Sequence, residues 1–501
     1  MPRPSDAPVT PRPITLARAG DHPVVGGMFI AAQFLVLNAI GLFATAYIIR
    51  ELGALRYGQW ATAAALAAAY GLITSVGLRT LFVREIARQP ESARELLAAQ
   101  LSLRILLGAV AATSALVTAF VLGYPPVVIA CTAVGCLWIL LSVISSTFAD
   151  VLQSLERFGS YSAVALASGI AVTATSVIAV ALGCGPVGLS FAYLAAPATS
   201  TLLYWRSVQR HVDISLRWET AGARKLLREA RLVGFSQIAT AVRDRAEQLL
   251  VPRLVGLEAF GVFSAGAMIG DRLAHVPDAV CTAFYPRISR TAAGTAHGAV
   301  ESSVTRMLTI GLVASMPPAV LGSYLAPSIA GVLLPNDAET CRRIIAITVW
   351  AVPFSAVSLG MSYALQAAGR HDDVARLGLR ATVISAGACA GLITWFGITG
   401  ASWAVLARPA TVLLTLLPAF RRAFPGVLRT VPLTRIALST TALAGVCLVA
   451  GSEPIWPALL VALTGAATYG AALLAARVFT IEALVRLFTP AAHNMAANLK
   501  S

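Results

Sequence analysis

The stretch "LLGAVAATSALVTAFVLG", residues 106–123, runs for eighteen residues without one charged side chain. An apolar segment of this length can cross the roughly 30 Å hydrocarbon core of a bilayer as a helix. Its apolar and polar residues do not alternate, as they would over about ten residues in a strand of a membrane barrel. Because backbone groups in lipid must bond within their own segment, a helix is the remaining choice. Runs of this kind recur along the chain, so the sequence predicts an all-α polytopic membrane protein.

The composition of the whole chain agrees with this prediction. Of the 501 residues, 57% are hydrophobic and only 12% are charged, whereas soluble domains carry about 25% charged residues. The net charge of +15 comes from arginines in the short links between apolar runs, which is typical of membrane topology, so we expect no nucleic-acid partner. The seven cysteines are scattered without a CxxC pair, and no spacing of metal ligands appears.

Periodic apolar runs predict about fourteen transmembrane helices. They lie at 24–49, 59–78, 99–122, 127–150, 161–182, 187–205, 233–256, 260–285, 304–325, 342–365, 376–396, 400–420, 435–450 and 455–476. Basic residues crowd alternate links, above all the link after the sixth helix, while "GYPP" (123–126) and "GCGP" (183–186) contain none. This asymmetry predicts that both termini are cytoplasmic.

The sequence of the first six helices recurs in the next six. "IIRELGALRYGQW" (48–60) aligns with "VPRLVGLEAFGVF" (251–263), and "GLSFAYLAAPAT" (188–199) aligns with "GASWAVLARPAT" (400–411). An even number of helices returns the second copy in the same orientation, so two pseudo-symmetric bundles are expected, with the substrate between them. The predicted parts are a disordered cytoplasmic tail (1–23), an N-terminal six-helix bundle (24–205), a basic cytoplasmic linker (206–232), a C-terminal six-helix bundle (233–424), two extra helices (425–478) and a cytoplasmic tail (479–501).

Four segments resemble the polysaccharide-transporter, or oligosaccharide-flippase, branch of the multidrug/oligosaccharidyl-lipid/polysaccharide (MOP) flippase superfamily. They are "EQLLVPRLVGLEAFGVFSAG" (247–266), "AFYPRIS" (283–289), "YLAPSIAGVLLP" (324–335) and "ALQAAGR" (364–370). The resemblance implies two six-helix bundles around a central cavity, with helices 13 and 14 outside. It also implies transport of polyprenyl-pyrophosphate-linked sugar repeat units from the cytoplasmic to the outer leaflet. The family places an acidic residue, often Asp, nine positions before Gly256, where this chain has the longer Glu247.

Charged residues gather in helices 7 and 8, in "TAVRDRAEQLL" (240–250) and "GDRLAHVPD" (270–278). Counted from the turn near Glu258, Asp244 and Asp271 both lie about 20 Å inside the outer end, near the midplane. A charge there costs about 2.5–3.5 kcal/mol if it faces lipid, so these residues must face each other or a water-filled cavity. The matching positions of the first half are uncharged, so the charge belongs to the second bundle alone.

Two interpretations of this cluster remain open. In one, ion pairs such as Arg243 with Glu247 lock helices 7 and 8 together. In the other, the charges line a transport cavity, where arginine suits phosphate because its planar fork donates two hydrogen bonds and stays charged.

A polar side chain elsewhere, Arg104 on helix 3, is expected to extend to the cytoplasmic interface.

The transport interpretation assigns a role to each polar residue of the predicted cavity. The residues expected to bind pyrophosphate are Arg243, Arg245, Arg272 and Arg408, and for Arg408 the alternative is a paired structural charge. The residues expected to carry a coupling proton or sodium ion are Asp244, Glu247, Asp271, Asp278 and His275. Gln33 and Asn38 on helix 1 are expected to contact sugar hydroxyls, with hydrogen bonds between helices as the alternative. No catalytic residue, metal or other cofactor is expected.

The leading function is therefore a flippase for lipid-linked oligosaccharides that works by alternating access. The rivals are a flippase for a peptidoglycan lipid-linked precursor and a cation-coupled drug antiporter, which the basic residues of helices 7 and 8 disfavour. An enzyme is not expected, since the chain has no DxD pair, no HxxxxD pair and no GxxxxGK[ST] loop for ATP. The expected location is the bacterial plasma (inner) membrane, for cell-surface or exopolysaccharide synthesis. The expected partners are the polyprenyl-linked oligosaccharide, membrane lipid, a polysaccharide polymerase and glycosyltransferases.

Overall fold

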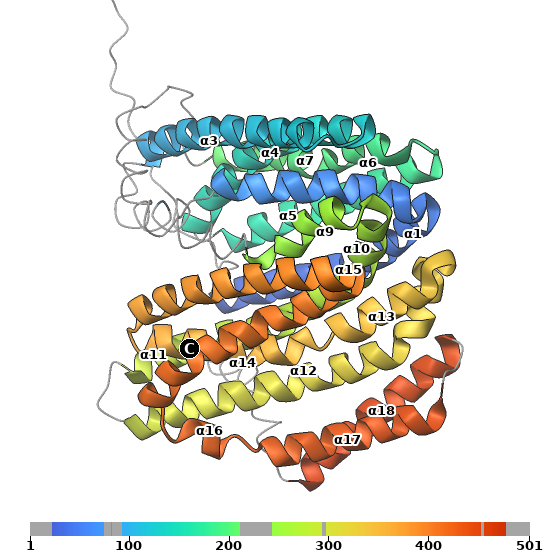
Figure 1. The fold of residues 1–501 in the computed structure, drawn as a ribbon. Coiled ribbons are helices and arrows are strands. Elements are labelled where there is room, and N and C mark those ends of the chain that lie inside the picture. The colour runs from blue at the N-terminus through green and yellow to red at the C-terminus, as the bar shows by residue number, and fades with distance from the viewer. Residues whose placement is uncertain are drawn as a thin grey trace, which may run out of the picture. The chain divides into compact units, whose positions relative to one another are not determined.

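The computed structural model describes residues 23–74, 82, 93–155, 157–210, 243–292, 297–451 and 455–476. Every regular element within these residues is a helix, and ten segments of them are long and apolar enough to span a membrane. The chain is thus an all-α, multi-pass membrane protein, as predicted (Figure 1). The number fourteen stays a prediction, because two of the ten segments each contain a glycine kink that separates two of the expected helices.

The chain divides into two compact units, Met1–Leu52 with Gln59–Val242, and Gly53–Gly58 with Arg243–Ser501. The first unit contains most of α1 (Pro23–Gly71), then η1 (Leu72–Thr74), α3 (Ala93–Val121), α4 (Pro126–Ser154), α5 (Phe158–Ala181), α6 (Gly185–Tyr193) and α7 (Ala195–Val208). Helix α4 packs against both α3 and α7, and its Phe148 and Leu152 join Leu97 and Tyr204 in a buried cluster.

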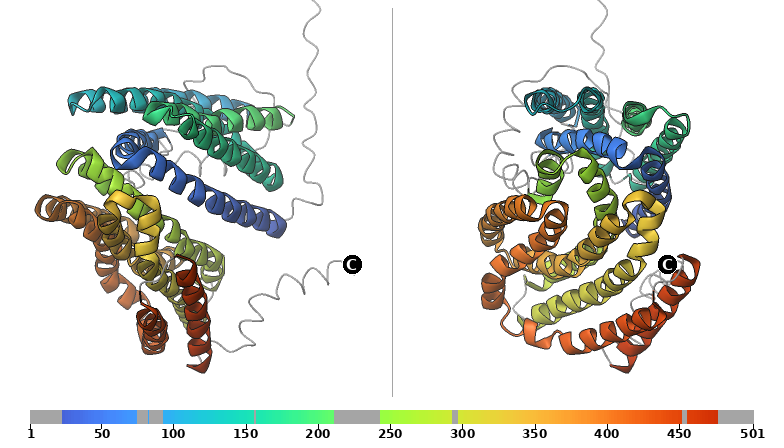
Figure 2. Two further views of the ribbon diagram at one scale, coloured as in Figure 1. Left: turned by 90° about the vertical axis from the view of Figure 1, so that its right-hand side faces the viewer. Right: turned by 45° about the vertical axis from the view of Figure 1, so that its right-hand side comes forward.

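The second unit contains Gly53–Gly58 of α1 and the helices that follow Arg243. Its helices are α9 (Ala246–Leu254), α10 (Leu257–Leu273), α11 (His275–Ala292), α12 (His297–Leu333), η3 (Pro335–Asp337), α13 (Ala338–Thr348), α14 (Ala351–Ala367), α15 (His371–Ala423), α16 (Val427–Thr430), α17 (Leu433–Ala450) and α18 (Ile455–Ala475). The last two helices pack on α12, where Tyr469 donates a hydrogen bond of 3.1 Å to the carbonyl of Val313 (Figures 1 and 2).

Matched glycines bend the backbone in both copies of the repeat. Gly53 and Gly256 have φ of 72° and 123°, and Gly185 and Gly397 have φ of 63° and 59°. A positive φ is readily adopted only by glycine, so each pair marks the same sharp turn between two spans. The two offsets, 203 and 212 residues, are the offsets at which the sequence segments align, so the structure supports the repeat.

The turn at 53–58 packs closely against the start of α10 within the second unit. A Cβ on Gly58 would overlap the carbonyl oxygen of Leu257, and a Cβ on Gly261 would overlap that of Ala54. These four residues form two pairs at the repeat offset, so the contact is reciprocal. Close backbone approach of this kind requires glycine at both crossing points.

Three of the expected helices are broken once, and proline gives the physical reason. The predicted helices 187–205, 260–285 and 342–365 are interrupted at Leu194, at Ala274 and at 349–350. Each break lies three or four residues before a proline, namely Pro197, Pro277 and Pro353. Proline has no N–H and its ring crowds the carbonyl four residues earlier, so the helix opens there.

Candidate functional site

The predicted site residues are divided between the two units. Gln33 and Asn38 lie on α1 in the first unit, and all the charged candidates lie on α9, α10, α11 or α15, or just before α9, in the second. The side-chain oxygen of Gln33 is buried and accepts no hydrogen bond from the described residues. Whether these two side chains meet the charged residues in one cavity stays a prediction.

Arg408 on α15 is the centre of the charged cluster in the second unit. Its Nη1 donates hydrogen bonds to Glu247 Oε1 at 2.9 Å and to the main-chain carbonyl of Asp244 at 2.7 Å. The Glu247 side chain is only 4% exposed, whereas that of Arg408 is 21% exposed. Arg408 lies eleven residues beyond the turn at Gly397, or about 17 Å along the helix, which is deep in the span.

Both side chains of this ion pair have polar atoms that form no hydrogen bond with the described residues. Within the part of the chain that the structure describes, Glu247 Oε2 is buried without a partner, and only Nη1 of the Arg408 guanidinium donates. A guanidinium has five N–H donors in a planar fork. Arg408 is therefore anchored through one nitrogen, and its Nε and Nη2 can still donate to an anion.

The remaining charges before and within α9 pair locally. Arg243 Nε contacts Asp244 Oδ1 at 2.9 Å, and Arg245 Nη1 donates to Gln248 Oε1 at 3.0 Å. The sequence suggested an ion pair between Arg243 and Glu247, and this prediction is wrong. Glu247 forms its ion pair with Arg408 instead. Helix α9 begins only at Ala246, so residues 243 and 247 are not one continuous turn apart.

Three ionisable side chains of α10 and α11 are exposed. Asp271, His275 and Asp278 are all exposed, as expected for a polar stripe. Asp271 lies close enough to Arg408 and Arg245 for their charges to act on it, which joins α10 to the cluster. Asp278 is farther along the chain and accepts a hydrogen bond of 3.2 Å from the hydroxyl of Tyr363 on α14. Arg272, in the last turn of α10, is partly buried.

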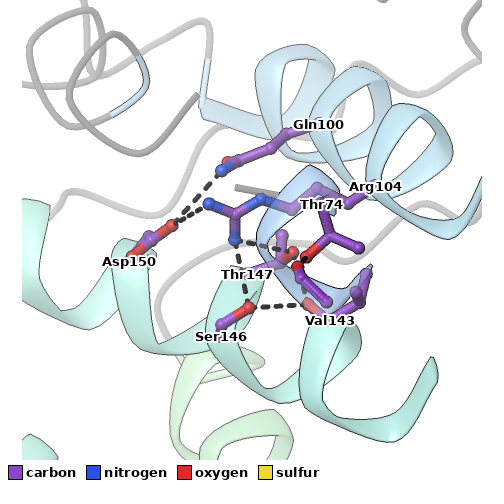
Figure 3. A network of polar contacts seen from close by, with 8 residues as sticks. Thr74, Gln100, Arg104, Val143, Ser146, Thr147 and Asp150 are labelled. Atoms are coloured by element: carbon purple, nitrogen blue, oxygen red, sulfur yellow. Dashed lines mark hydrogen bonds and ion pairs between the residues drawn. The ribbon is translucent and has the colours of Figure 1, made fainter. Parts of the chain in front are cut away.

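A second buried ion pair, which the sequence analysis missed, lies in the first unit. Arg104 on α3 contacts Asp150 on α4 at 2.9 Å, with the two side chains 4% and 5% exposed. Its Nη1 also donates to the hydroxyls of Ser146 and Thr147, and Gln100 donates to Asp150 (Figure 3). The expectation that Arg104 extends to the interface is therefore wrong. Asp150, at the end of an apolar run, was the sequence signal for its partner.

The sequence profile of one protein family matches this chain. The family is described as "Polysaccharide biosynthesis protein", and the match covers residues 26–292. Among curated proteins, no sequence matches this chain significantly.

Solved structures show which fold the chain has. The inward closed conformation of the lipid II flippase MurJ superposes with a TM-score of 0.69 at 13% identity, covering 89% of this chain and 98% of that one. An inward-facing multidrug resistance MATE family transporter of the MOP superfamily gives 0.59 at 18% identity, covering 79% and 96%. A MOP superfamily transporter from Pyrococcus furiosus gives 0.53 at 17% identity, covering 83% and 100%. At these identities the similarity establishes the fold.

Proposed function

Because this chain belongs to the polysaccharide biosynthesis protein family and has the fold of MOP superfamily transporters, we propose that it is a flippase for polyprenyl-pyrophosphate-linked oligosaccharide repeat units. It moves them from the cytoplasmic to the outer leaflet by alternating access, for cell-surface or exopolysaccharide synthesis. The family description names a biosynthetic process, and the fold is that of transporters, so transport of a lipid-linked intermediate satisfies both.

The observation that carries this proposal is the guanidinium of Arg408. A charge this deep in a span costs several kcal/mol unless it is paired or hydrated, so such residues usually serve a function. Arg408 is fixed by Glu247 and keeps donors for an anion, and a pyrophosphate accepts bidentate hydrogen bonds from such a fork. Arg243, Arg245 and Arg272 are the further proposed pyrophosphate contacts.

The carboxylates beside these arginines are the proposed sites of ion coupling. Asp271 is the strongest candidate, because it is exposed and within range of the charges of Arg408 and Arg245. Asp244, Glu247, Asp278 and His275 supply further positions for a proton or a sodium ion. In the first unit, Gln33 and Asn38 are the proposed contacts to sugar hydroxyls.

The distribution of arginines supports a bacterial inner-membrane protein with both termini in the cytoplasm. The chain then works where the substrate is made, and a polysaccharide polymerase and glycosyltransferases are its proposed partners. A reporter that is active only outside the cytoplasm will be silent when fused at residue 215 and active at residues 124 and 184. Activity at 215 contradicts the proposed topology.

Purified protein in liposomes tests the function directly. We expect it to move a fluorescent undecaprenyl-pyrophosphate oligosaccharide across the bilayer, and we expect a deletion strain to retain the same lipid on the inner leaflet. Normal delivery to the outer leaflet, in a deletion strain without a redundant flippase, contradicts the proposal.

A peptidoglycan-precursor flippase is the second candidate, favoured by the superposition on nearly the whole of MurJ. Both candidates carry a polyprenyl pyrophosphate, so the charged cluster does not separate them. The identity of the lipid-linked glycan that accumulates in the deletion strain does: a peptidoglycan precursor selects the second candidate, and any other oligosaccharide selects the first.

A further inference from the structure

The chain just before α9 contains a helix break that neither proline nor glycine explains. Arg243 and Asp244 are helical, Arg245 is a turn residue with φ −125° and ψ 11°, and α9 begins at Ala246. The residues three and four positions after Arg245 are Gln248 and Leu249, so no proline opens the helix, unlike at Leu194 or Ala274. Kinks without proline, glycine or a bulge usually arise where a side chain inserts into the hydrogen-bond ladder.

Arg408 is the side chain that inserts at this break. In a continuous helix the carbonyl of Asp244 accepts the amide of Gln248, four residues later. Here that carbonyl accepts Arg408 Nη1 at 2.7 Å, and the first main-chain hydrogen bond of α9 runs from Leu249 to Arg245 at 3.3 Å. The same Nη1 holds Glu247 in the first turn of α9, so one guanidinium nitrogen bonds to both sides of the break.

The first half of the chain provides an internal comparison without the arginine. At the repeat offset, Ala196 occupies the position of Arg408, and Ala44 occupies that of Glu247. The corresponding helix there, α1, is continuous from Pro23 until the glycine kink at Gly53. Within the residues described, the break therefore occurs in the copy that has Arg408 and is missing from the copy that lacks it.

We propose that Arg408 is a positioning residue that holds this break open, and that the phosphate group of the substrate displaces it. An anion that binds Nε and Nη2 of the 21% exposed Arg408 draws the guanidinium toward itself, and Nη1 then leaves the Asp244 carbonyl and Glu247. Once Arg408 turns to the anion, the carbonyl of Asp244 accepts the Gln248 amide and the two helical segments join. Binding of the charged headgroup is thereby coupled to the shape of the backbone at Arg245, where α9 begins.

This inference rests on the proposed function, which supplies a pyrophosphate, and amide hydrogen exchange tests it. The protein is placed in nanodiscs of zwitterionic lipid, and exchange is followed in the peptide that contains residues 246–248, with and without inorganic pyrophosphate. We expect pyrophosphate to slow exchange of the Gln248 amide by about fivefold, the protection that one net helix hydrogen bond gives. Exchange that does not change with pyrophosphate overturns the inference, whether or not the anion binds.

Three variants separate displacement from a purely structural pair. In Arg408→Ala the break closes without ligand, so exchange is slow and pyrophosphate has no effect. Arg408→Lys retains the charge toward Glu247 with one ammonium, and is the variant to use if Arg408→Ala does not fold; we expect intermediate exchange. Glu247→Gln removes the competing charge, so the pyrophosphate concentration at half effect falls. Fast exchange in folded Arg408→Ala, equal to that of the parent, overturns the inference.

A control variant and two lipid compositions complete the design. Arg342→Ala breaks another arginine–glutamate pair of the same unit, with Glu339, and we expect the parent's response to pyrophosphate. Nanodiscs of anionic phosphatidylglycerol without pyrophosphate test whether a phospholipid headgroup alone displaces Arg408. Slower exchange of the Gln248 amide in those nanodiscs would overturn the claim that the displacing phosphate comes from the substrate. If the purified protein does not flip lipid-linked oligosaccharide and pyrophosphate still closes the break, the proposed function fails and the displacement stands. If the protein flips lipid-linked oligosaccharide but pyrophosphate does not close the break, the proposed function stands and the displacement of Arg408 fails.

Discussion

The two units each bury one arginine–carboxylate pair deep among their helices, and the pairs differ in what surrounds them. Arg104 and Asp150 in the first unit, and Arg408 and Glu247 in the second, are both 2.9 Å apart. The first pair sits among the hydroxyls of Ser146 and Thr147 and the amide of Gln100, so both terminal nitrogens of Arg104 are bonded. Among the described residues, the second pair has the main-chain carbonyl of Asp244 beside it, and Arg408 donates through Nη1 alone.

The difference shows how a structural pair can be distinguished from a functional one. Arg104 and Arg408 are both paired with a carboxylate, but the side chain of Arg104 is 4% exposed and that of Arg408 is 21% exposed. A pair as buried as Arg104 and Asp150 joins two helices, and its burial leaves a ligand little access to the guanidinium. A pair with one exposed, partly bonded guanidinium and one buried, unpartnered carboxylate oxygen keeps that capacity. The distance between the charged atoms, 2.9 Å in both pairs, does not show this difference.

The largest effect is expected when the carboxylate of the first pair is removed. Asp150→Asn leaves the charge of Arg104 buried and uncompensated, so the free energy of unfolding should fall by about 3–5 kcal/mol. The matched change Glu247→Gln leaves Arg408, which water can reach, and should lower it by only about 1 kcal/mol. Unfolding of both variants in the same detergent measures the difference. Equal losses would show that the two pairs do not differ in kind.

Double variants give the next effect and separate stability from transport. Removing both partners, as in Arg104→Ala with Asp150→Ala, eliminates the stranded charge and should restore stability and flipping together. In Arg408→Ala with Glu247→Ala we expect stability near that of the parent, with flipping still reduced by about 10- to 100-fold, the value of one charge-assisted hydrogen bond. Flipping in liposomes and a melting curve are measured for each. A second-unit double variant that flips like the parent contradicts a substrate role for Arg408.

The sequence predicted the elements of the fold because each rests on local information. Apolar length predicts a span, and arginine asymmetry predicts an orientation. The recurrence of Gly53 at Gly256 predicts the repeat, which both positive φ values support. The breaks at Leu194 and Ala274 were also predictable in principle, since Pro197 and Pro277 follow them. Those prolines carry the signal in the sequence itself.

The pairing within the site was not predictable, because it depends on which helices pack together. Glu247 and Arg408 are 161 residues apart, and nothing in either local sequence indicates the other. The sequence placed Arg243 opposite Glu247 by assuming one continuous helix, and the break at Arg245 removes that assumption. Both Glu247 and Arg408 are among the predicted site residues, and their pairing came only from the tertiary structure.

Lysine substitutions give a smaller effect that sharpens the comparison further. Arg408→Lys keeps the positive charge but loses the planar fork, so flipping should fall by about tenfold while stability changes little. Arg104→Lys loses its hydrogen bonds to Ser146 and Thr147, so stability should fall by about 1–2 kcal/mol, and the folded fraction should flip normally. If Arg408→Lys flips at the parent's rate, Arg408 acts as charge balance alone.

The smallest effect is expected at a third pair, which serves as the reference for the other two. Arg342 donates to Glu339 at the start of α13, with the two side chains 40% and 57% exposed. Water and salt screen a pair as exposed as this, and holding two long side chains in place costs entropy, so its formation adds little stability. Arg342→Ala should therefore leave both the melting temperature and the rate of flipping unchanged within error. A clear loss of flipping in Arg342→Ala, at normal stability, would show that partial burial of the guanidinium is not what separates Arg408 from an exposed arginine such as Arg342. The start of α13 would then have to be included in the substrate path.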